Sequence, residues 1–324
     1  MRYFGYRPEQ TYGTEDTSAT VRYLQMGKCT LDVPTDPDLE VPTFEETPSR
    51  TKRGLYSPSG DIEIALDIYS INEFLKFTLG NELTPSTGKY LMYPGSGRIL
   101  PSFTAYVGKD DGNPNDFEHI FYGCVISKLS ISLSDGLATA TISIQAQKDG
   151  KAALKADNAI TFSDSYPIAF YEAETKLGSS SLTARTTSFD FEFDNGISAA
   201  NGRAFGSMFP YKLPSSGKTP TIKTNVFYEG YDFLVKFWGD SDGPTCNTTY
   251  ESYQITFTDE QENILILLFP RVALSKAGAP IEGTDEIKQS LEFKVLKAEG
   301  SKPTGYGSGN LRTSVIAAVT IASS

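Results

Sequence analysis

The segment 129–144, LSISLSDGLATATISI, constrains the fold more than any other part of the chain. Apolar and hydroxyl side chains alternate on both sides of Asp135-Gly136, and a period of two indicates β-strands. An Asp-Gly pair accepts the positive φ angles of a tight two-residue turn. We therefore predict a β-hairpin. Its cross-strand pairs are Leu133 with Ala138, Ser132 with Thr139, Ile131 with Ala140, Ser130 with Thr141 and Leu129 with Ile142.

One side of this hairpin is apolar, and the other carries hydroxyl groups. The hydroxyl side carries no charge before Lys128 at its end, whereas an exposed sheet face usually carries more Lys and Glu. Two interpretations remain open, an ordinary solvent face and a face that meets a neighbouring sheet or another partner. The candidate residues of this face are Lys128, Ser130, Ser132, Thr139 and Thr141.

Composition and spacing predict a mainly β protein. A chain of 324 residues, 39% hydrophobic, is long enough for roughly two domains with cores of their own. β-branched and aromatic residues recur in short runs between Gly, Pro, Asn and Asp. Further strands are expected at Phe103–Val107, Ile160–Phe162, Phe189–Phe193, Tyr253–Phe257, Ile264–Phe269 and Val315–Ile321.

A strand followed by a short helix occurs twice, in segments 57–80 and 219–239. In the first segment, Ser70 with Glu73 three residues later indicates a capping box, and Gly80 indicates the helix end. In the second, Gly239 ends the same pattern. We predict two copies of one β domain, each with one short helix, although two amphipathic elements can also match by chance. The expected divisions are an extended N-terminal segment 1–50, a first domain 51–168 and a second domain 169–324.

Residues 32–48, DVPTDPDLEVPTFEETP, contain four prolines and six acids and no Lys or Arg. Proline excludes helix and central strand, so an extended arm is expected. A flexible solvated tail is the alternative. A basic cluster follows at once, and the acidic arm of a neighbouring copy could meet it. The candidate contact residues are Asp32, Asp36, Asp38, Glu40, Glu45 and Glu46 with Arg50, Lys52 and Arg53.

Catalysis is not supported by the sequence. His119 is the single histidine, and a position in a loop or at a strand edge explains it better than acid–base chemistry. The acidic loops 109–118 and 239–247 lack the EF-hand order, so solvated turns are favoured over calcium sites. Asp190, Glu192 and Asp194 alternate along one strand and indicate a polar sheet face. We expect no enzyme activity, no cofactor and no metal.

Charge, cysteine content and hydropathy narrow the class further. The net charge of −11 argues against a surface that generally attracts nucleic acid. Three widely spaced cysteines indicate buried thiols and no disulfide framework. No signal peptide or membrane-spanning segment is expected, because residues 1–13 lack an apolar stretch and the longest apolar runs are short.

An ordered set of segments resembles the tail tube proteins of long-tailed, siphovirus-like bacterial and archaeal viruses, in particular the type with two tube domains per chain. Order and spacing carry this resemblance, and it covers most of the chain beyond residue 50. The segments are SPSGDIEIALDIYSINEFLKFTLG, RILPSFTAYVG, FYGCVISKLSISLSDGLATATISIQAQ, FDFEFDNG, the helix block ending FWG, LFPRVAL and DEIKQSLEFKV.

The resemblance implies two tandem β-sandwich or half-barrel domains in a structural subunit of the virion tail. It implies pseudo-hexameric rings of three chains, stacked into a tube in the host cytoplasm, with the arm locking rings together. Implied partners are a tape-measure protein, a tail terminator and distal tail proteins. Double-stranded DNA would pass through without sticking during ejection, with the hydroxyl face towards the lumen or a neighbouring sheet. A different β-rich virion or carbohydrate-binding module, or a hydrolase with an unrecognised site, are the alternatives.

Overall fold

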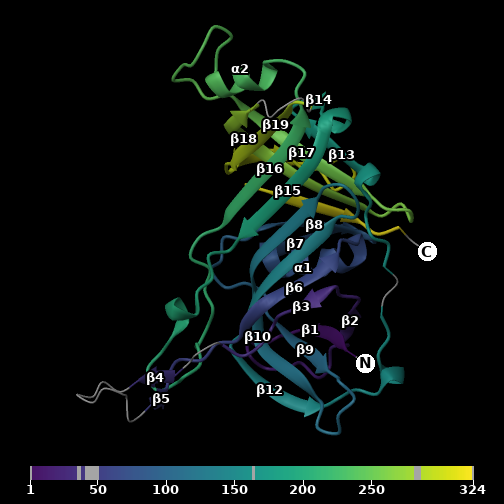
Figure 1. Cartoon of the computed structure of the whole chain (residues 1–324), viewed down its shortest axis with the longest axis vertical. Coiled ribbons are helices and arrows are strands. Elements are labelled where there is room, and N and C mark those ends of the chain that lie inside the picture. Colours follow the sequence, from purple (N-terminus) through teal and green to yellow (C-terminus); the bar gives the residue numbers. More distant parts are fainter. Residues whose placement is uncertain (1, 35–37, 41–50, 163–164, 281–285, 323–324) are drawn as a thin grey trace.

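The computed structural model describes residues 2–34, 38–40, 51–162, 165–280 and 286–322, and this part is mainly β with two α-helices (Figure 1). The predicted fold class, β-sandwich halves with one short helix each, is confirmed. The elements of the first half are β1 (Tyr3–Pro8), β2 (Arg22–Leu24), β3 (Lys28–Cys29), β4 (Asp38–Glu40), β5 (Thr51–Arg53), β6 (Ser59–Ala65), α1 (Ile68–Leu79), β7 (Gly80–Ser86), β8 (Lys89–Pro94), β9 (Phe103–Lys109), β10 (Phe117–Leu133), β11 (Thr139–Gln145) and β12 (Lys148–Ala153).

The second half lies above the first in Figure 1 and contains the second helix at its far end. Its elements are β13 (Ala173–Leu177), β14 (Ser180–Ser181), β15 (Thr186–Asp194), β16 (Thr219–Phe227), α2 (Asp232–Trp238), β17 (Tyr250–Thr258), β18 (Ile264–Gly278), β19 (Lys288–Val295), β20 (Ala298–Ser301), β21 (Asn310–Thr313) and β22 (Ile316–Thr320).

The predicted hairpin is formed by β10 and β11, and its register is confirmed. Ser130 lies opposite Thr141, and Ile131 lies opposite Ala140. The apolar side of the hairpin is buried in the main core. The connection is wider than the predicted two-residue turn, because only Gly136 has a positive φ (128°). A tight turn would let pairing resume at Leu137, but the hairpin pair nearest the turn is that of Thr139, two residues further along the chain.

The segment after the turn is held by the chain that links the two halves. The backbone N–H of Ala138 donates a hydrogen bond to the carbonyl of Ile168, and Leu137 forms a bridge with Ala169. These contacts compete with the tight turn and open it. They come from residues about thirty positions away, so the local Asp-Gly signal could not reveal them.

The first helix confirms the predicted face and end, but the predicted capping box is wrong. Asp67, not Ser70, is the N-cap, and its carboxylate accepts a hydrogen bond from the backbone N–H of Ser70 at 2.8 Å. The helix therefore starts at Ile68, because a carboxylate caps as well as a hydroxyl does. Gly80 ends the helix in the left-handed conformation with φ 88°.

Two further expectations are wrong. Residues 3–29 are not an extended segment, because β1 pairs with β2 and β9, and β3 pairs with β6. Residues Ile160–Phe162 do not form a strand, because Phe162 makes only an isolated bridge with Tyr23. The tyrosines of β1 explain the first error, since Tyr3 and Tyr6 are almost fully buried in the first half.

The same strand pairs occur in both halves. In the first half, β1 pairs with β2 and β9, β9 with β10, β10 with β11 and β12, and β11 with β6. In the second half, β13 pairs with β14 and β17, β17 with β18, β18 with β19 and β22, and β19 with β16. This common order is the one that a duplicated domain would produce.

The two halves share one hydrogen-bonded sheet. β10 reaches from the first half to the second, where its residues 128–133 lie between β11 and β15 (Figure 1). β8 of the first half pairs with β22 of the second half. Sheet pairing therefore runs without a break through β3, β6, β11, β10, β15, β16, β19, β18, β22, β8 and β7.

Asn195 holds this junction together. Its side chain is fully buried, and its amide donates hydrogen bonds to the carbonyls of Thr78 at 3.1 Å and Ile126 at 3.0 Å. Its backbone N–H donates to the carbonyl of Ser127 at 2.8 Å. The amide thus joins the last turn of α1 and β10 to the end of β15, at a site that water does not reach.

The second helix is less buried than the first. Gly239 ends it in the left-handed conformation, as predicted. Phe233 is the one buried residue of α2, whereas Phe237 is 45% exposed. Within the described part, no helix has the length and apolarity needed to cross a membrane.

We predict that Asn195→Ala destabilises the chain by about 2 kcal/mol, because two buried carbonyls lose their donor. Urea unfolding followed by near-ultraviolet circular dichroism measures this loss. Asn201→Ala, at an exposed position, is the matched control and is expected to change the unfolding free energy by less than about 0.5 kcal/mol. Equal effects of the two substitutions would contradict the role of Asn195 in the junction.

Candidate functional site

The candidate hydroxyl residues lie together on one side of β10 and β11, as expected. Ser130, Ser132, Thr139 and Thr141 are all half-buried on the side opposite the core. β15 extends this face, because its alternating carboxylates point to the same side as these hydroxyls. The hydroxyl face is therefore one part of a larger surface that crosses the junction between the halves.

The carboxylates of β15 contact the hydroxyl residues directly. The hydroxyl of Ser132 donates a hydrogen bond to Asp190, and the ammonium nitrogen of Lys128 lies 3.3 Å from a carboxylate oxygen of Glu192. The side chains of Lys128 and Glu192 are 41% and 48% exposed, so this pair contributes at most about 1 kcal/mol of stability. Its importance lies in the local neutralisation of charge.

Lysines from other strands balance the remaining carboxylates. In register, Lys223 of β16 lies between Asp190 of β15 and Glu292 of β19. Lys28 of β3 lies opposite Glu63 of β6. On the described strands of this face, the carboxylates are Asp61, Glu63, Asp190, Glu192, Asp194 and Glu292, and the lysines are Lys28, Lys128, Lys223, Lys276, Lys288 and Lys294.

Besides hydroxyls and carboxylates, this surface therefore carries as many lysines as acids on its described strands. The negative net charge of the chain does not come from this surface, because its lysines match its acids. Sequence reasoning found the acids on β15 but missed Lys223 and Lys294. Only the pairing of strands that lie far apart in the sequence brings these lysines to the same face.

The face is hollowed at the junction of β10, β15 and β16. A recess of about 270 Å³ is lined there mainly by polar side chains of all three strands. Hydroxyls, carboxylates and ammonium groups alternate around it, so the surface is well hydrated. Such a surface can slide past a polyanion without offering it a cluster of unpaired cations.

The candidate arm residues are only partly within the described chain. Asp36, Glu45, Glu46 and Arg50 lie outside the described residues. β4 and β5 form a two-stranded hairpin within one chain, with Asp38 opposite Arg53, Leu39 opposite Lys52 and Glu40 opposite Thr51. This hairpin projects from the body at the lower left of Figure 1.

Asp32 does not belong to the projecting hairpin. Its carboxylate lies 3.0 Å from the ammonium nitrogen of Lys109 in the first half. Partial burial raises the pKa of Asp32, but the hydrogen bonds from Lys109 and from the backbone N–H of Val33, together with the nearby positive charge, outweigh it and hold the pKa below its usual value. Asp32 therefore stays ionised in a contact within its own chain.

A second long loop runs beside the base of the arm. The backbone N–H of Tyr56 donates to the carbonyl of Met208, and the rings of Tyr56 and Phe209 meet edge to face at 5.8 Å. This loop connects β15 to β16, as residues 30–58 connect β3 to β6. Its Phe205 is fully exposed. Both halves thus send a loop from the same place in the repeat towards the same end of the molecule.

The single histidine has structural surroundings. His119 is not in a loop but inside β10, 5% exposed, with its Nε2 atom 2.7 Å from a carboxylate oxygen of Asp149 on β12. Its ring lies 4.2 Å from that of Phe121. The residue therefore packs between strands β9 and β12 of the first half.

The acidic loop 109–118 is satisfied by its own backbone. The carboxylate of Asp116 accepts hydrogen bonds from the N–H groups of Asp111 and Asn113, and Arg2 pairs with Asp111 at 2.7 Å. Among the described residues, no group of three or more His, Cys, Asp or Glu side chains is placed to hold a metal ion. Of the three cysteines, Cys124 is buried as expected, Cys29 is half-buried, and Cys246 is exposed, contrary to expectation.

Comparison with known families assigns this architecture. A family model described as phage tail tube protein matches residues 2–295. The match includes β1 to β3 as well as both halves up to β19, so it extends beyond the segments that carry the resemblance in the sequence. No curated protein matches the chain.

Proposed function

The chain belongs to the phage tail tube protein family, and from this premise we propose that it forms the genome conduit of a long-tailed, siphovirus-like virus. The protein is a structural component of the virion tail and assembles with itself into a tube. The single observation that carries the proposal is the family match over both halves of the chain.

Each ring contains three chains and therefore six similar β halves. The halves follow one another head to tail within the chain, and the same relation repeated between chains closes a circle. Closure also pairs sheet edges that would otherwise invite aggregation. The continuous pairing of β10 with β15 across the junction within the chain supports this arrangement.

Rings stack through the projecting loops at one end of the molecule. The β4–β5 hairpin, with the acidic and basic arm residues around it, and the loop carrying Phe205 contact the next ring. Stacking has no built-in stop, so a tape-measure protein in the lumen sets the length. A tail terminator and distal tail proteins complete the ends, and the parts assemble in the host cytoplasm.

The hydroxyl face and the lysines and carboxylates of the neighbouring strands together form one surface, the balanced polar face. This face, with Lys128, Ser130, Ser132, Thr139 and Thr141, is directed towards the lumen. Double-stranded DNA binds proteins mainly by releasing counterions to their unpaired cations. Each lysine of this face except Lys288 has a carboxylate in its own row or the next, and this carboxylate competes with phosphate for the ammonium group. DNA therefore passes during ejection without being held.

Concentrated purified protein is expected to form stacked rings or tubes, because ring closure and stacking need no other component. Negative-stain electron microscopy over a series of concentrations tests this directly. Isolated particles at every concentration would contradict the tail tube assembly and favour a different β-rich module.

Deletion of residues 35–50 is expected to leave rings intact and to shorten or abolish tubes, because the arm joins one ring to the next. Tube length in negative-stain images is the measurement. Phe205→Ser is a second variant with the same expected direction, since it removes an exposed ring from the neighbouring loop. Tubes of normal length in both variants would exclude these loops from stacking.

Neutralising the β15 acids is expected to make assembled tubes retain DNA. Asp190→Asn, Glu192→Gln and Asp194→Asn together leave neighbouring lysines unpaired, so binding of short double-stranded DNA should tighten about tenfold at 0.1 M salt and weaken steeply as salt rises. Co-sedimentation of labelled DNA with tubes measures this. The control is Glu260→Gln, Glu262→Gln and Glu299→Gln, which changes the net charge equally at other exposed sites. Equal retention by both triple variants would place the face away from the DNA path.

A further inference from the structure

The repeated pairing order leaves one junction of the repeat without its partner. Residues 128–133 of β10 pair with β11 on one side and with β15 of the following half on the other. The corresponding part of β18, residues 274–278, pairs with β19 on one side, and no described strand pairs with its other side. β3 corresponds to β15 in the repeat, and among the described strands β6 is its only partner.

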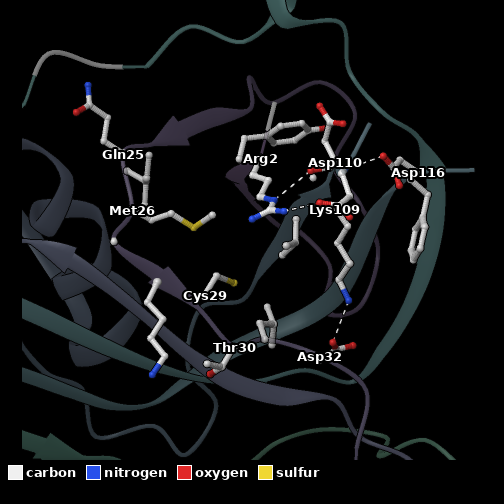
Figure 2. A pocket seen from close by; sticks show the side chains of 18 of the residues that line it. Arg2, Gln25, Met26, Cys29, Thr30, Asp32, Lys109, Asp110 and Asp116 are labelled. Carbon is white, nitrogen blue, oxygen red and sulfur yellow. Dashed lines mark hydrogen bonds and ion pairs between the residues drawn. The ribbon is translucent and has the colours of Figure 1, made fainter. Parts of the chain in front are cut away.

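A cavity lies beside the unpaired edge of β3. It measures about 730 Å³, and its walls are residues 24–32, the end of β9, the loop after it and the N-terminal residues (Figure 2). Met26 and Cys29 extend into it from the wall of residues 24–32, and Arg2 extends into it from the N-terminal residues. The loop wall is fixed by the hydrogen bonds of Arg2 to the Asp110 carbonyl and the Asp111 carboxylate.

The corresponding corner of the second half holds a smaller pocket of about 150 Å³, and the end of β10 forms part of its wall. It is lined by residues of β13, β15 and β17, which are the counterparts of β1, β3 and β9. Leu133, from the end of β10 in the first half, lies in this corner beside Phe189 and Ile255. The repeat therefore shows what fills such a corner, namely the end of the long strand from the preceding half.

We propose that the edge of β18 in one copy pairs with residues 28–31 of the next copy and fills this cavity. This inference rests on the proposed ring and names its contact. It specifies which strands, in which register and with which residues, form the joint between chains in the ring. The occupant of the cavity is a second copy of this chain.

The register follows from partners shared by the two halves. Ile62 of β6 and Ile222 of β16 correspond, and they pair with Cys29 and Phe191. Ala277 likewise corresponds to Ile131, because the residue of β19 that pairs with Ala277 corresponds to the residue of β11 that pairs with Ile131. Because Ile131 lies opposite Phe191, Ala277 of one copy is expected opposite Cys29 of the next.

The adjoining residues give a consistent interface. Leu274 is expected opposite Leu31, and both belong to the apolar side, since Leu31 is buried and Leu274 packs against the core. Lys276 is expected opposite Thr30 on the polar side, beside Glu292 of its own chain. The apolar and polar faces therefore stay continuous across the joint, which a slip of one residue would reverse.

The exposed aromatic residues around α2 are expected to lie in the same contact between copies. In the first half, α1 and the β7–β8 hairpin follow β6 and lie against β22 of the second half. In the second half, α2 and the loop after it occupy this position in the repeat, with Tyr231 and Phe237 64% and 45% exposed. The repeat places them over β12 of the next copy, which corresponds to β22.

Disulfide trapping tests the register. Ala277→Cys is introduced together with Cys246→Ser, which removes the exposed thiol, and native Cys29 is kept. Burial raises the pKa of the Cys29 thiol, so assembled protein is oxidised at mildly alkaline pH. Directly opposite residues of paired strands lie at a separation that a disulfide can bridge, so intermolecular disulfides are expected, up to covalent trimers on non-reducing gels.

Lys276→Cys in the same background is the matched control. Its side chain lies on the other face of the strand, so about tenfold less crosslinking is expected. Adding Cys29→Ser to the Ala277→Cys variant should remove the crosslink. As a second measurement, assembly of the Cys246→Ser protein should slow alkylation of Cys29 at least about tenfold, because the edge of β3 becomes covered.

The outcomes separate this inference from the proposed function. Normal tubes in which Ala277→Cys crosslinks no better than Lys276→Cys, or in which Cys29 stays as reactive as in unassembled protein, would overturn the pairing and leave the tube function standing. Crosslinked trimers without tubes would support the pairing and contradict stacking. If no crosslinks form and no particle is larger than one chain, both the pairing and the tube function would be overturned.

Discussion

Pairing of strand edges is the constraint on which the rest of this structure depends. An unpaired edge exposes a row of N–H and C=O groups that must find water or another strand. Within the chain, β10 and β15 satisfy each other and thereby fuse the two halves. Asn195 then fixes the fused halves through the carbonyls of Thr78 and Ile126, so the junction is a rigid part of the core.

The balanced polar face is a consequence of this fusion. β10, β15, β16 and β19 contribute to one surface only because their edges are joined in register, and the register sets most of the lysines near a carboxylate. Lys223 between Asp190 and Glu292 shows the effect. On a surface of this kind, pairing of charge would weaken the attraction for polyanions without a large excess of acid.

The sequence predicts local features well and joints between distant segments poorly. The register of β10 with β11 and the left-handed glycines after both helices follow from alternation and from backbone sterics, and both are confirmed. The open turn at Gly136 and the lysines on β16 and β19 depend on contacts made by residues far along the chain. The weak burial of α2 has the same origin, since its apolar stripe resembles that of α1 but no described strand covers Phe237. Asp67 as cap is a different case, because its contact with Ser70 is local and Asp67 and Ser70 are both suitable capping residues.

The two kinds of junction in the repeat differ in the side chains that they bring together. Within the chain, Ile131 lies opposite Phe191, and both are buried. In the proposed joint between copies, the corresponding pair is the smaller Ala277 with Cys29. A smaller pair removes less apolar area from water, at roughly 25 cal/mol per Å², so each joint between copies is weaker than the joint within one copy. The covalent link also spares the inner joint the entropy lost when separate molecules associate. Each chain can therefore fold as one unit first, and the weaker outer joints become stable when ring closure makes several of them form together.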